Sequence, residues 1–464
     1  MKVKRVKFFL SMIPICIIIY ILIALIPYMG SIYISEETKS SFDIANFYGQ
    51  YNGPERVMLL ECPQDAFFHR VNLISNARES ILLASFSIHR GVSSDIVMGA
   101  LLSAADRGVQ VKILNNAFIG QLPARYRNAM AVHENISVYV FNPFEFFRPR
   151  YANSVMHDKY MVVDGEFMII GGRNIADRDF IPDCFTGRPS FDREVLVYNY
   201  NPTEENSSIA QVTAYFNRKI ASGHSYLRSG RGNIGVRYSL IDSYIRFMKT
   251  FWLDNFTFDY YQNTIATNRI TLITNPFEGT KKESVVAYNL FMLTKNSDRV
   301  VAQSPYIALT NRNFEFFTQA VTGRDFTLLT NSLASTPNLP AFSAYVVRRS
   351  DILATGIRVY EYQCNQSSLH GKTYLFDGRL TAIGSFNINE RSIRSDTESM
   401  LIIDSAEFHD IMLEAINAQI AQSLRVNPDG SLADGNVEEA SPYFGKRALY
   451  NVAGRLLRGL WFMF

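Results

Sequence analysis

Cysteine is scarce in this chain of 464 residues, and its four cysteines are far apart: Cys16, Cys62, Cys184 and Cys364. No two of them have the close spacing of a zinc or thiol redox motif, so the sequence carries no signature of such a site. The net charge is also small, at +3, and overall charge therefore does not point to a nucleic-acid-binding protein. Charged residues make up 19% of the chain and hydrophobic residues 47%, a composition that excludes extended disorder.

A long uncharged apolar run covers residues 8–34, directly after the basic residues Lys2, Lys4, Arg5 and Lys7. A helix needs about 20 apolar residues to cross a membrane, whereas the core of a signal peptide has roughly 7–15. We therefore predict that residues 1–35 form an uncleaved single-pass transmembrane anchor in the cell membrane, with a cytoplasmic N-terminus and extracytoplasmic catalytic domains. A signal peptide is the alternative, because Pro14 and Pro27 could each end a shorter helix.

A short motif occurs twice: His, one residue, Lys, four residues, Asp. The first copy is His157, Lys159 and Asp164, and the second is His370, Lys372 and Asp377. In both copies an apolar segment then leads to a glycine and an asparagine, which are Gly171 with Asn174 and Gly384 with Asn387. One such motif would usually be accidental, but two complete copies with equal spacing are a specific signal.

The segments before each motif also correspond in order. Residues 79–88, 111–116 and 136–141 match residues 298–307, 326–331 and 357–362, and all are rich in β-branched and aromatic residues. A helical pattern at residues 94–107 separates two of them. Alternating strands and helices predict an α/β sheet in each half of a duplicated chain.

The remaining segments complete a predicted domain order. We expect a first catalytic domain at 36–205, a linker and helix at 206–265, a second catalytic domain at 266–425 and a tail at 426–464. The apolar segment 239–259 is expected to pack between the two halves. Residues 446–464 carry four basic residues among many apolar ones, which predicts an amphipathic helix at a lipid interface or docked on the protein's own surface.

Paired histidines and lysines suit chemistry at a phosphodiester. A neutral imidazole can attack phosphorus as a nucleophile, and a second, protonated imidazole can supply a proton to the leaving alkoxide. Two lysines can stabilise the charge on the phosphate oxygens, so this scheme requires no metal and no cofactor. Because His and Lys at alternate positions share one face of a strand, each pair can address the same phosphate.

Other residues around the motifs have predicted supporting roles. Asn174 and Asn387 can donate hydrogen bonds to phosphate oxygens. Glu194 and Glu398, at matched positions downstream, are predicted to orient the histidines by accepting from one ring nitrogen. Asp164 and Asp377 each precede a glycine, and from the residues alone they are better suited to fixing a turn than to chemistry.

These motifs resemble those of the phospholipase D superfamily, from about residue 55 to 425. The resemblance implies two α/β/α sandwich domains related by a pseudo-twofold axis, with one active site between them. It also implies that His157 is the nucleophile, that His370 is the acid and base, and that both aspartates belong to the catalytic motif.

The segments 171–177, 329–334 and 384–392 are similar to bacterial cardiolipin synthases, particularly the cardiolipin synthase C-like subgroup. That similarity implies a phosphate-binding role for Ser385, whereas Gly172 stands where many relatives have a serine. Many of those relatives also carry two anchor helices rather than one.

The resulting hypothesis is phosphatidyl transfer between membrane phospholipids. The substrate would be phosphatidylglycerol, with phosphatidylethanolamine as a possible donor, and the product would be cardiolipin. Hydrolysis to phosphatidate is an alternative, because acceptor choice depends on the shape of the site and on water exclusion. A membrane-anchored nuclease is a further alternative, but the sequence offers only a thin basic stripe for nucleic acid, at Arg228 and Arg231. A pure binding protein would need no second histidine.

Overall fold

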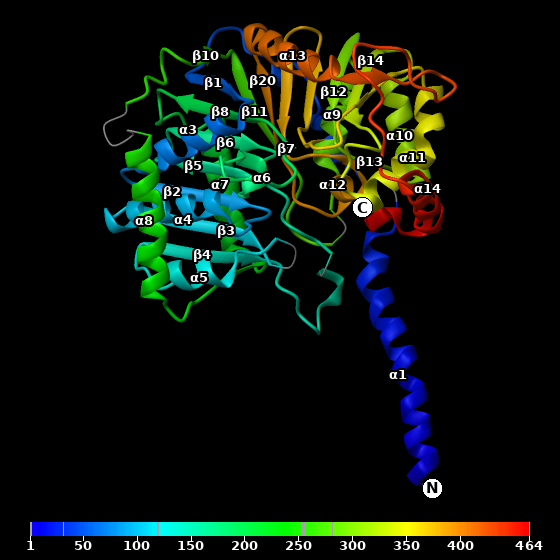
Figure 1. Ribbon diagram of the computed structural model, residues 1–464, viewed down its shortest axis with the longest axis horizontal. Helices are drawn as coiled ribbons and strands as arrows, with labels where there is room; N and C mark the ends of the chain where they lie inside the picture. The colour runs from blue at the N-terminus through cyan, green and yellow to red at the C-terminus, as the bar shows by residue number, and fades with distance from the viewer. Residues whose placement is uncertain are drawn as a thin grey trace.

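The computed structural model describes residues 2–30, 32–117, 120–151, 153–251, 257–280 and 282–463. Two α/β halves lie side by side, and the helix α1 (Lys2–Leu25) projects from one end of the molecule (Figure 1). Each half is built around one mixed sheet with parallel and antiparallel strands. The predicted α/β fold with two duplicated domains is therefore confirmed.

The first sheet has nine strands among the described residues, in the order β10-β1-β8-β6-β5-β2-β3-β4-β9. Its β2, β3 and β4 are parallel, and most other neighbours are antiparallel. The strands are β1 (Glu55–Leu60), β2 (Ser80–Ser85), β3 (Gln110–Asn116), β4 (Ile136–Phe141), β5 (Tyr160–Val163), β6 (Phe167–Gly171), β8 (Glu194–Asn199), β9 (Ser225–Leu227) and β10 (Ile265–Ala266).

The second sheet repeats this order as β11-β20-β18-β17-β12-β14-β15-β21, again counted over the described residues. Apart from β10, each strand of the first sheet has a counterpart in the same place, so the repeat found in the sequence is a repeat of topology. The strands are β11 (Arg269–Thr274), β12 (Arg299–Gln303), β14 (Asp325–Asn331), β15 (Arg358–Tyr362), β17 (Thr373–Phe376), β18 (Leu380–Gly384), β20 (Ser399–Asp404) and β21 (Ser423–Arg425).

One apolar core joins the two halves. The helices α7 (Ser208–Ala221) and α13 (Ala406–Ile420) contribute to it from matched positions, each after the last long strand of its half. Phe216 of α7 and Met412 of α13 are fully buried there, together with Val57 of the first sheet and Leu401 of the second. Because this core holds side chains of both sheets, the halves form one packed unit.

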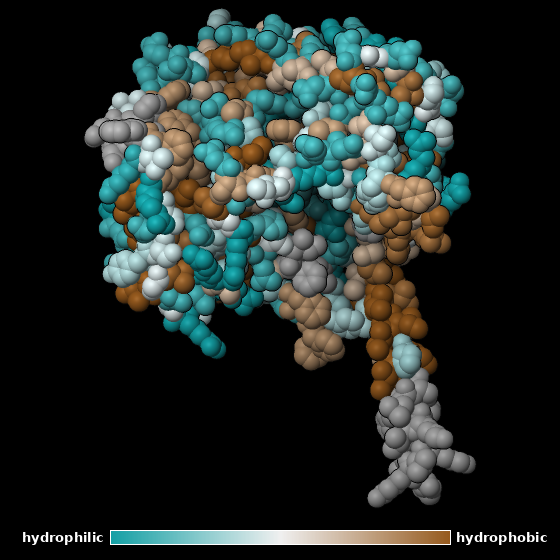
Figure 2. Space-filling view, in the orientation of Figure 1, coloured by the Kyte–Doolittle hydropathy of each residue, from teal (hydrophilic) through white to brown (hydrophobic). Residues whose placement is uncertain are grey.

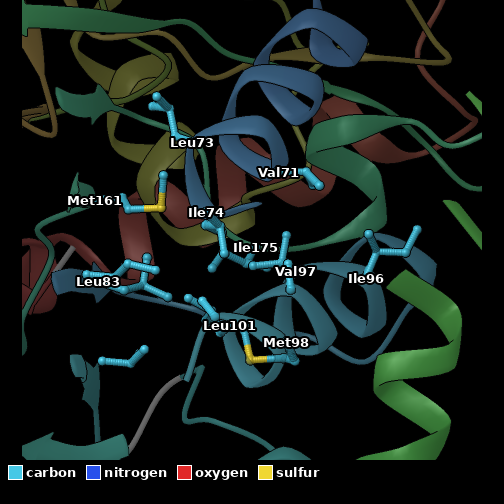
Figure 3. Packing of buried hydrophobic residues seen from close by; sticks show 14 of the residues in the cluster. Val71, Leu73, Ile74, Leu83, Ile96, Val97, Met98, Leu101, Met161 and Ile175 are labelled. Carbon is cyan, nitrogen blue, oxygen red and sulfur yellow. The ribbon is translucent and has the colours of Figure 1, made fainter. Parts of the chain in front are cut away.

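The outer face of each sheet carries its own layer of helices. In the first half, side chains of α3 and α4 pack against those of β2 and β5, as Figure 3 shows for Ile74, Leu101, Leu83 and Met161. The helices of these layers are α3 (Pro63–Asn76), α4 (Val92–Asp106), α5 (Ala124–Met130) and α8 (Ile234–Thr250), and then α9 (Val285–Lys295), α10 (Asn311–Val321), α11 (Leu339–Ala354) and α14 (Lys446–Leu456).

The helix α8 corrects one expectation. The sequence predicted that residues 239–259 pack between the halves, but α8 packs on the outer surface of the first half, against α4. A β-carbon at Gly99 of α4 would lie 2.1 Å from the carbonyl oxygen of Leu240, so glycine allows the two helices to approach closely. An apolar stripe is needed whether this helix packs between the halves or on α4, so the stripe alone does not predict which surface the helix contacts. Residues 252–256 lie outside the described residues.

The predicted transmembrane helix is not found. No helix in the described part of the chain is both long and apolar enough to cross a membrane. The helix α1 contains Pro14, and the side chains of Ile13, Ile17 and Ile18 are about half exposed, at 50%, 53% and 56%. Met1 and Ser31, which belong to the predicted anchor, lie outside the described residues.

The predicted tail helix forms and docks on the protein. One face of α14 packs on α11, where Tyr450 contacts the ring of Phe342 at 6.0 Å between centroids. Its other face leaves Val452 and Leu456 exposed. The short elements are η1 (Ile26–Tyr28), α2 (Glu36–Ser41), η2 (Ile44–Phe47), η3 (Pro149–Tyr151), α6 (Asp177–Phe180), β7 (Ser190–Phe191), β13 (Ile307–Ala308), β16 (Ser368–Leu369), β19 (Ile388–Asn389), α12 (Glu390–Arg394) and η5 (Arg458–Met463).

Candidate active site

The two motifs meet where the halves exchange backbone hydrogen bonds. His157 lies before β5, and its amide donates to the carbonyl oxygen of Thr397 in the other half at 3.2 Å. His370 lies before β17, and its amide donates to the carbonyl oxygen of Phe191 in the first half at 2.6 Å. The short strands β7 and β16 pair across the same boundary. The fold therefore brings both histidines to the junction of the halves.

Each histidine is bonded to a carboxyl group from the opposite half. Nδ1 of His157 lies 3.0 Å from Oε1 of Glu398, and Nδ1 of His370 lies 2.5 Å from Oδ2 of Asp192. A hydrogen bond at Nδ1 fixes the ring orientation and leaves Nε2 without these carboxyl partners. The contact of Glu398 with a histidine agrees with the sequence-based prediction.

The prediction for Glu194 is wrong. Its carboxylate is buried in an ion pair with Arg70, at 2.6 Å, and it lies 3.6 Å from Arg173. The strand register gives the reason: Gly171 pairs with Glu194, whereas Gly384 pairs with Met400. The true counterpart of Glu398 is thus Asp192, two residues earlier on the same face of the extended chain.

The residues at the matched positions 172 and 385 differ in size, and so do the carboxyl side chains beside them. Ser385 donates its hydroxyl hydrogen bond to Oε2 of Glu398, so this hydroxyl holds the carboxyl group rather than standing free for a phosphate. At Gly172, a β-carbon would lie 2.2 Å from Oδ1 of Asp192. Gly172 stands where the second half has Ser385, and the shorter carboxylate of Asp192 occupies the space that a side chain there would need.

The two lysines are buried beside the histidines. Nζ of Lys159 donates to the carbonyl oxygen of His157 at 2.6 Å, and Nζ of Lys372 donates to that of His370. Burial and mutual repulsion with Lys372 lower the pKa of Lys159 to about 7. Burial lowers the pKa of Lys372 to about 8, against the opposing charge of Asp192. A bound anion would restore full charge to both ammonium groups.

Both imidazoles are neutral at neutral pH in the free protein. Burial, together with the charge of Lys159, lowers the pKa of His157 well below its ordinary value. Burial and Lys372 lower the pKa of His370 to about 3, against the opposing charge of Asp192. A neutral His157 is ready to act as a nucleophile, whereas His370 gains a proton more readily once an anionic phosphate lies beside it.

The two carboxyl groups differ in their electrostatic environment. Burial raises the pKa of Glu398 to about 8, although Lys159 and the hydroxyl of Ser385 oppose this. Burial acts in the same direction on Asp192, but the charge of Lys372 and the bond from His370 hold its pKa below the ordinary value. The pseudo-symmetric pairs are therefore not electrostatically equivalent: Asp192 is firmly ionised, and Glu398 titrates near neutrality.

The two motif asparagines are buried in equivalent positions. Asn174 and Asn387 are 3% and 4% exposed, and neither amide oxygen has a hydrogen-bond partner within the described residues. A side-chain amide can present its NH₂ group in the same place after rotation about its last bond. Both amides therefore remain available to a ligand, and their predicted role in phosphate binding stays a prediction.

The motif aspartates lie outside the site. The carboxylate of Asp164 accepts from the backbone amides of residues 78, 79 and 80 at 2.8 Å each. That of Asp377 accepts from the amides of Asp298 and Arg299 at 3.0 and 2.8 Å. Both aspartates have positive φ, at 54° and 48°. They fix turns, as the residues alone suggested, and the catalytic role implied by the resemblance is not seen.

Sequence reasoning missed four residues in or beside the site. Asp192 was passed over because both halves contain Asp-x-Glu, which favoured the wrong alignment. The ring of Phe86 lies 5.0 Å from that of His157, and the ring of Tyr306 lies 6.1 Å from that of His370. Asp179 is 1% exposed with neither carboxylate oxygen hydrogen-bonded in the described structure, and burial raises its pKa to about 7.

Comparison with known proteins agrees with this geometry. The family model described as "Cardiolipin synthase, PLD-like domain" matches residues 71–220 and 292–420, which contain both motifs. Cardiolipin synthase C of Escherichia coli (strain K12) is 26% identical over 417 residues, or 81% of this chain and 86% of that protein. An uncharacterised protein of Helicobacter pylori (strain J99) is 30% identical over 388 residues, or 76% of each chain.

The fold also has a solved counterpart. The crystal structure of phosphatidylserine synthase from Haemophilus influenzae Rd KW20 superposes with a TM-score of 0.62 at 12% identity, over 94% of this chain and 97% of that one. Two matched sheets, two reciprocal histidine and carboxyl pairs and a family model covering more than half of the sequence agree with one another. The chain belongs to the cardiolipin synthase-like family of the phospholipase D superfamily.

Proposed function

We propose that this protein is a phosphatidyltransferase that makes cardiolipin from phosphatidylglycerol, with phosphatidylethanolamine as a possible second donor. The observation that carries the proposal is the reciprocal pairing of two histidines with carboxyl groups of the opposite halves, beside two buried lysines. The similarity to cardiolipin synthase C supports the choice of substrate.

The reaction follows from the bonds of the two histidines. Nε2 of His157 attacks the phosphorus of a phospholipid, and the bond from phosphorus to the headgroup oxygen breaks. His370 gives its proton to that oxygen, while Lys159 and Lys372 stabilise charge on the non-bridging oxygens. The acceptor hydroxyl then transfers its proton to His370 and attacks phosphorus, and the bond from nitrogen to phosphorus breaks.

A trapping experiment tests the nucleophile. Quenching the enzyme during turnover of a phospholipid labelled at phosphorus should give a protein-bound label that is stable to base and labile to acid, as expected for a phosphohistidine. The label should map to His157 and be absent from His157→Asn. A label that persists in His157→Asn at another residue would contradict the assignment.

Mass spectrometry of lipid products tests the reaction type. Purified protein is incubated with phosphatidylglycerol, with and without phosphatidylethanolamine. Cardiolipin is the expected product. Phosphatidate as the sole product would replace the transferase with a phospholipase D, and digestion of single-stranded DNA without lipid turnover would replace it with a nuclease.

A further inference from the structure

An exposed aromatic loop lies between β4 and β5, at residues 143–151. Its side chains Phe144, Phe146 and Phe147 are 55%, 62% and 93% exposed. Phenylalanine is normally among the more buried residues, and a contiguous exposed apolar patch usually marks an interaction site. Exposure of these three side chains to water is therefore unfavourable in free energy.

The aromatic loop has a defined shape. The hydroxyl of Tyr20 in α1 donates to the carbonyl oxygen of Phe146 at 2.9 Å, and the two rings stack at 5.1 Å between centroids. The hydroxyl of Tyr28 donates to the carbonyl oxygen of Arg150 at 2.7 Å. The hydroxyl of Tyr226 in β9 donates to Glu145 at 2.7 Å. These contacts hold the backbone of the loop at residues 146 and 150 and the ring of Phe146 in defined positions.

The apolar surface continues from the aromatic loop onto α1 and β9. Ile17 and Ile21 of α1 are 53% and 47% exposed, and Leu227 of β9 is 63% exposed. Figure 1 shows the connection after β4 and the helix α1 extending from the same end of the molecule. In Figure 2 apolar surface covers the coloured part of α1 and the projection beside it.

Basic residues flank the phenylalanines. Arg148 and Arg150 follow them directly; the guanidinium of Arg148 lies 4.6 Å from the ring of Tyr151 and 3.5 Å from Glu145. Arg150 is exposed and lies over the same ring at 5.1 Å. Apolar rings beside arginines suit an interface where acyl chains meet anionic phosphates.

We propose that the aromatic loop inserts Phe144, Phe146 and Phe147 into the surface of an anionic lipid bilayer, next to α1, and so holds the catalytic domains at the membrane that carries the substrate. The use of this contact for catalysis rests on the proposed function, whereas the insertion itself does not. Phenylalanine rings are stabilised at the boundary between headgroups and acyl chains, and neighbouring arginines bind the anionic headgroups.

Fluorescence quenching by brominated lipids tests the insertion in the full chain. Phe147→Trp is mixed with vesicles of phosphatidylglycerol and phosphatidylcholine that carry bromine on their acyl chains. We expect quenching above that of the wild type, whose tryptophans are Trp252 and Trp461. The control is Tyr51→Trp, at a residue that is 82% exposed and lies four residues before β1 in the sequence. The label of β1 is at the opposite end of the molecule from α1 in Figure 1. Equal quenching of the two variants would overturn the proposal.

Turnover of two kinds of substrate distinguishes a role in membrane docking from a role in the chemical step. Phe146→Ser/Phe147→Ser should lower turnover of vesicle phospholipid by about tenfold or more, since two apolar rings leave the lipid. Turnover of a monomeric short-chain phospholipid should stay unchanged. Equal loss on both substrates would contradict a docking role.

Two other outcomes are equally informative. Quenching of Phe147→Trp in a protein with no lipid turnover would reject the proposed function and leave the insertion standing. A blue shift of its emission that depends on protein concentration, without quenching, would instead show a second protein copy on the loop and would overturn the proposal.

Discussion

Asp192 and Glu194 are two residues apart, yet the structure gives them different tasks. Asp192 bonds Nδ1 of His370, and Glu194 is buried against Arg70. Asp192→Asn should lower kcat/KM by about 10²–10⁴-fold, because the imidazole of His370 loses the negative charge that orients it and stabilises its protonated form, and the fold should persist. Activity assays and thermal unfolding of the purified variant check this.

The matched variant Glu194→Gln should behave in the opposite way. Breaking a buried ion pair costs about 3–5 kcal/mol of unfolding free energy, since Arg70 is left without its partner. The protein that stays folded should keep most of its activity. A folded Glu194→Gln with the catalytic defect of Asp192→Asn would restore the original interpretation of the sequence.

Gly172 is expected to tolerate no side chain while Asp192 is present. Gly172→Ser places a β-carbon 2.2 Å from Oδ1 of Asp192, so the carboxylate must leave its place beside His370 and activity should fall. The double variant Gly172→Ser/Asp192→Glu copies the arrangement of Ser385 and Glu398 and should recover part of the loss. Steady-state kinetics of both variants, compared with Asp192→Glu alone, measure the coupling.

Ser385 should set the pH dependence through Glu398. Protonation removes the negative charge with which Glu398 orients Nδ1–H of His157 and stabilises positive charge on that ring. Activity is therefore lost as the pH falls through the pKa of Glu398, which burial raises to about 8. Ser385→Ala removes a hydrogen bond that stabilises the ionised form, and the pKa rises further. The acidic limb of a plot of kcat/KM against pH should move to higher pH.

The control for that profile is Ser93→Ala, which removes a buried hydroxyl with no hydrogen-bond partner in the described residues. It should leave the acidic limb in place. An unchanged limb in Ser385→Ala, or a shift to lower pH, would mean that the hydroxyl does not act on Glu398.

At the scale of elements, the contact of α4 with α8 depends on Gly99. Gly99→Ala places a β-carbon 2.1 Å from the carbonyl oxygen of Leu240, and overpacking of this kind costs about 1–3 kcal/mol of unfolding free energy. The variant should be cleaved faster within α8 in limited proteolysis. Gly223→Ala, where nothing lies within 4 Å of the added carbon, is the control and should match the wild type.

Periodicity and spacing predicted the elements better than their partners. The strands before each motif and the helix at residues 94–107 were predicted within a few residues, because buried strands and helices have distinct local patterns. The surface against which α8 packs and the register of β8 were not predicted. Both depend on contacts between segments that are far apart in the sequence. For β8, the Asp-x-Glu sequences of the two halves look equivalent although their strands pair in different registers.

At the scale of the whole molecule, the duplicated motif predicted two similar halves, and the family resemblance implied one active site between them. The sequence could not show that each half supplies the carboxyl group for the histidine of the other. The membrane span predicted from the N-terminal apolar run is not found among the described residues.

Both histidines are expected to act within one chain. His157→Asn and His370→Asn should each be inactive, and an equimolar mixture of the two should stay inactive in a lipid turnover assay. The reason is that the shared core and the exchanged hydrogen bonds already join the halves of a single chain. Recovery of activity on mixing would show that the working site forms between two chains.

The crossed carboxyl pairs also bear on synthesis at the ribosome. When the first half has emerged, its motif is complete, but the group that orients His157 is not made until residue 398. A chain that ends before the second half would therefore have His157 without the carboxyl group that orients it and without His370. Activity would appear in a single late step, and unfinished chains could not damage the lipids around them.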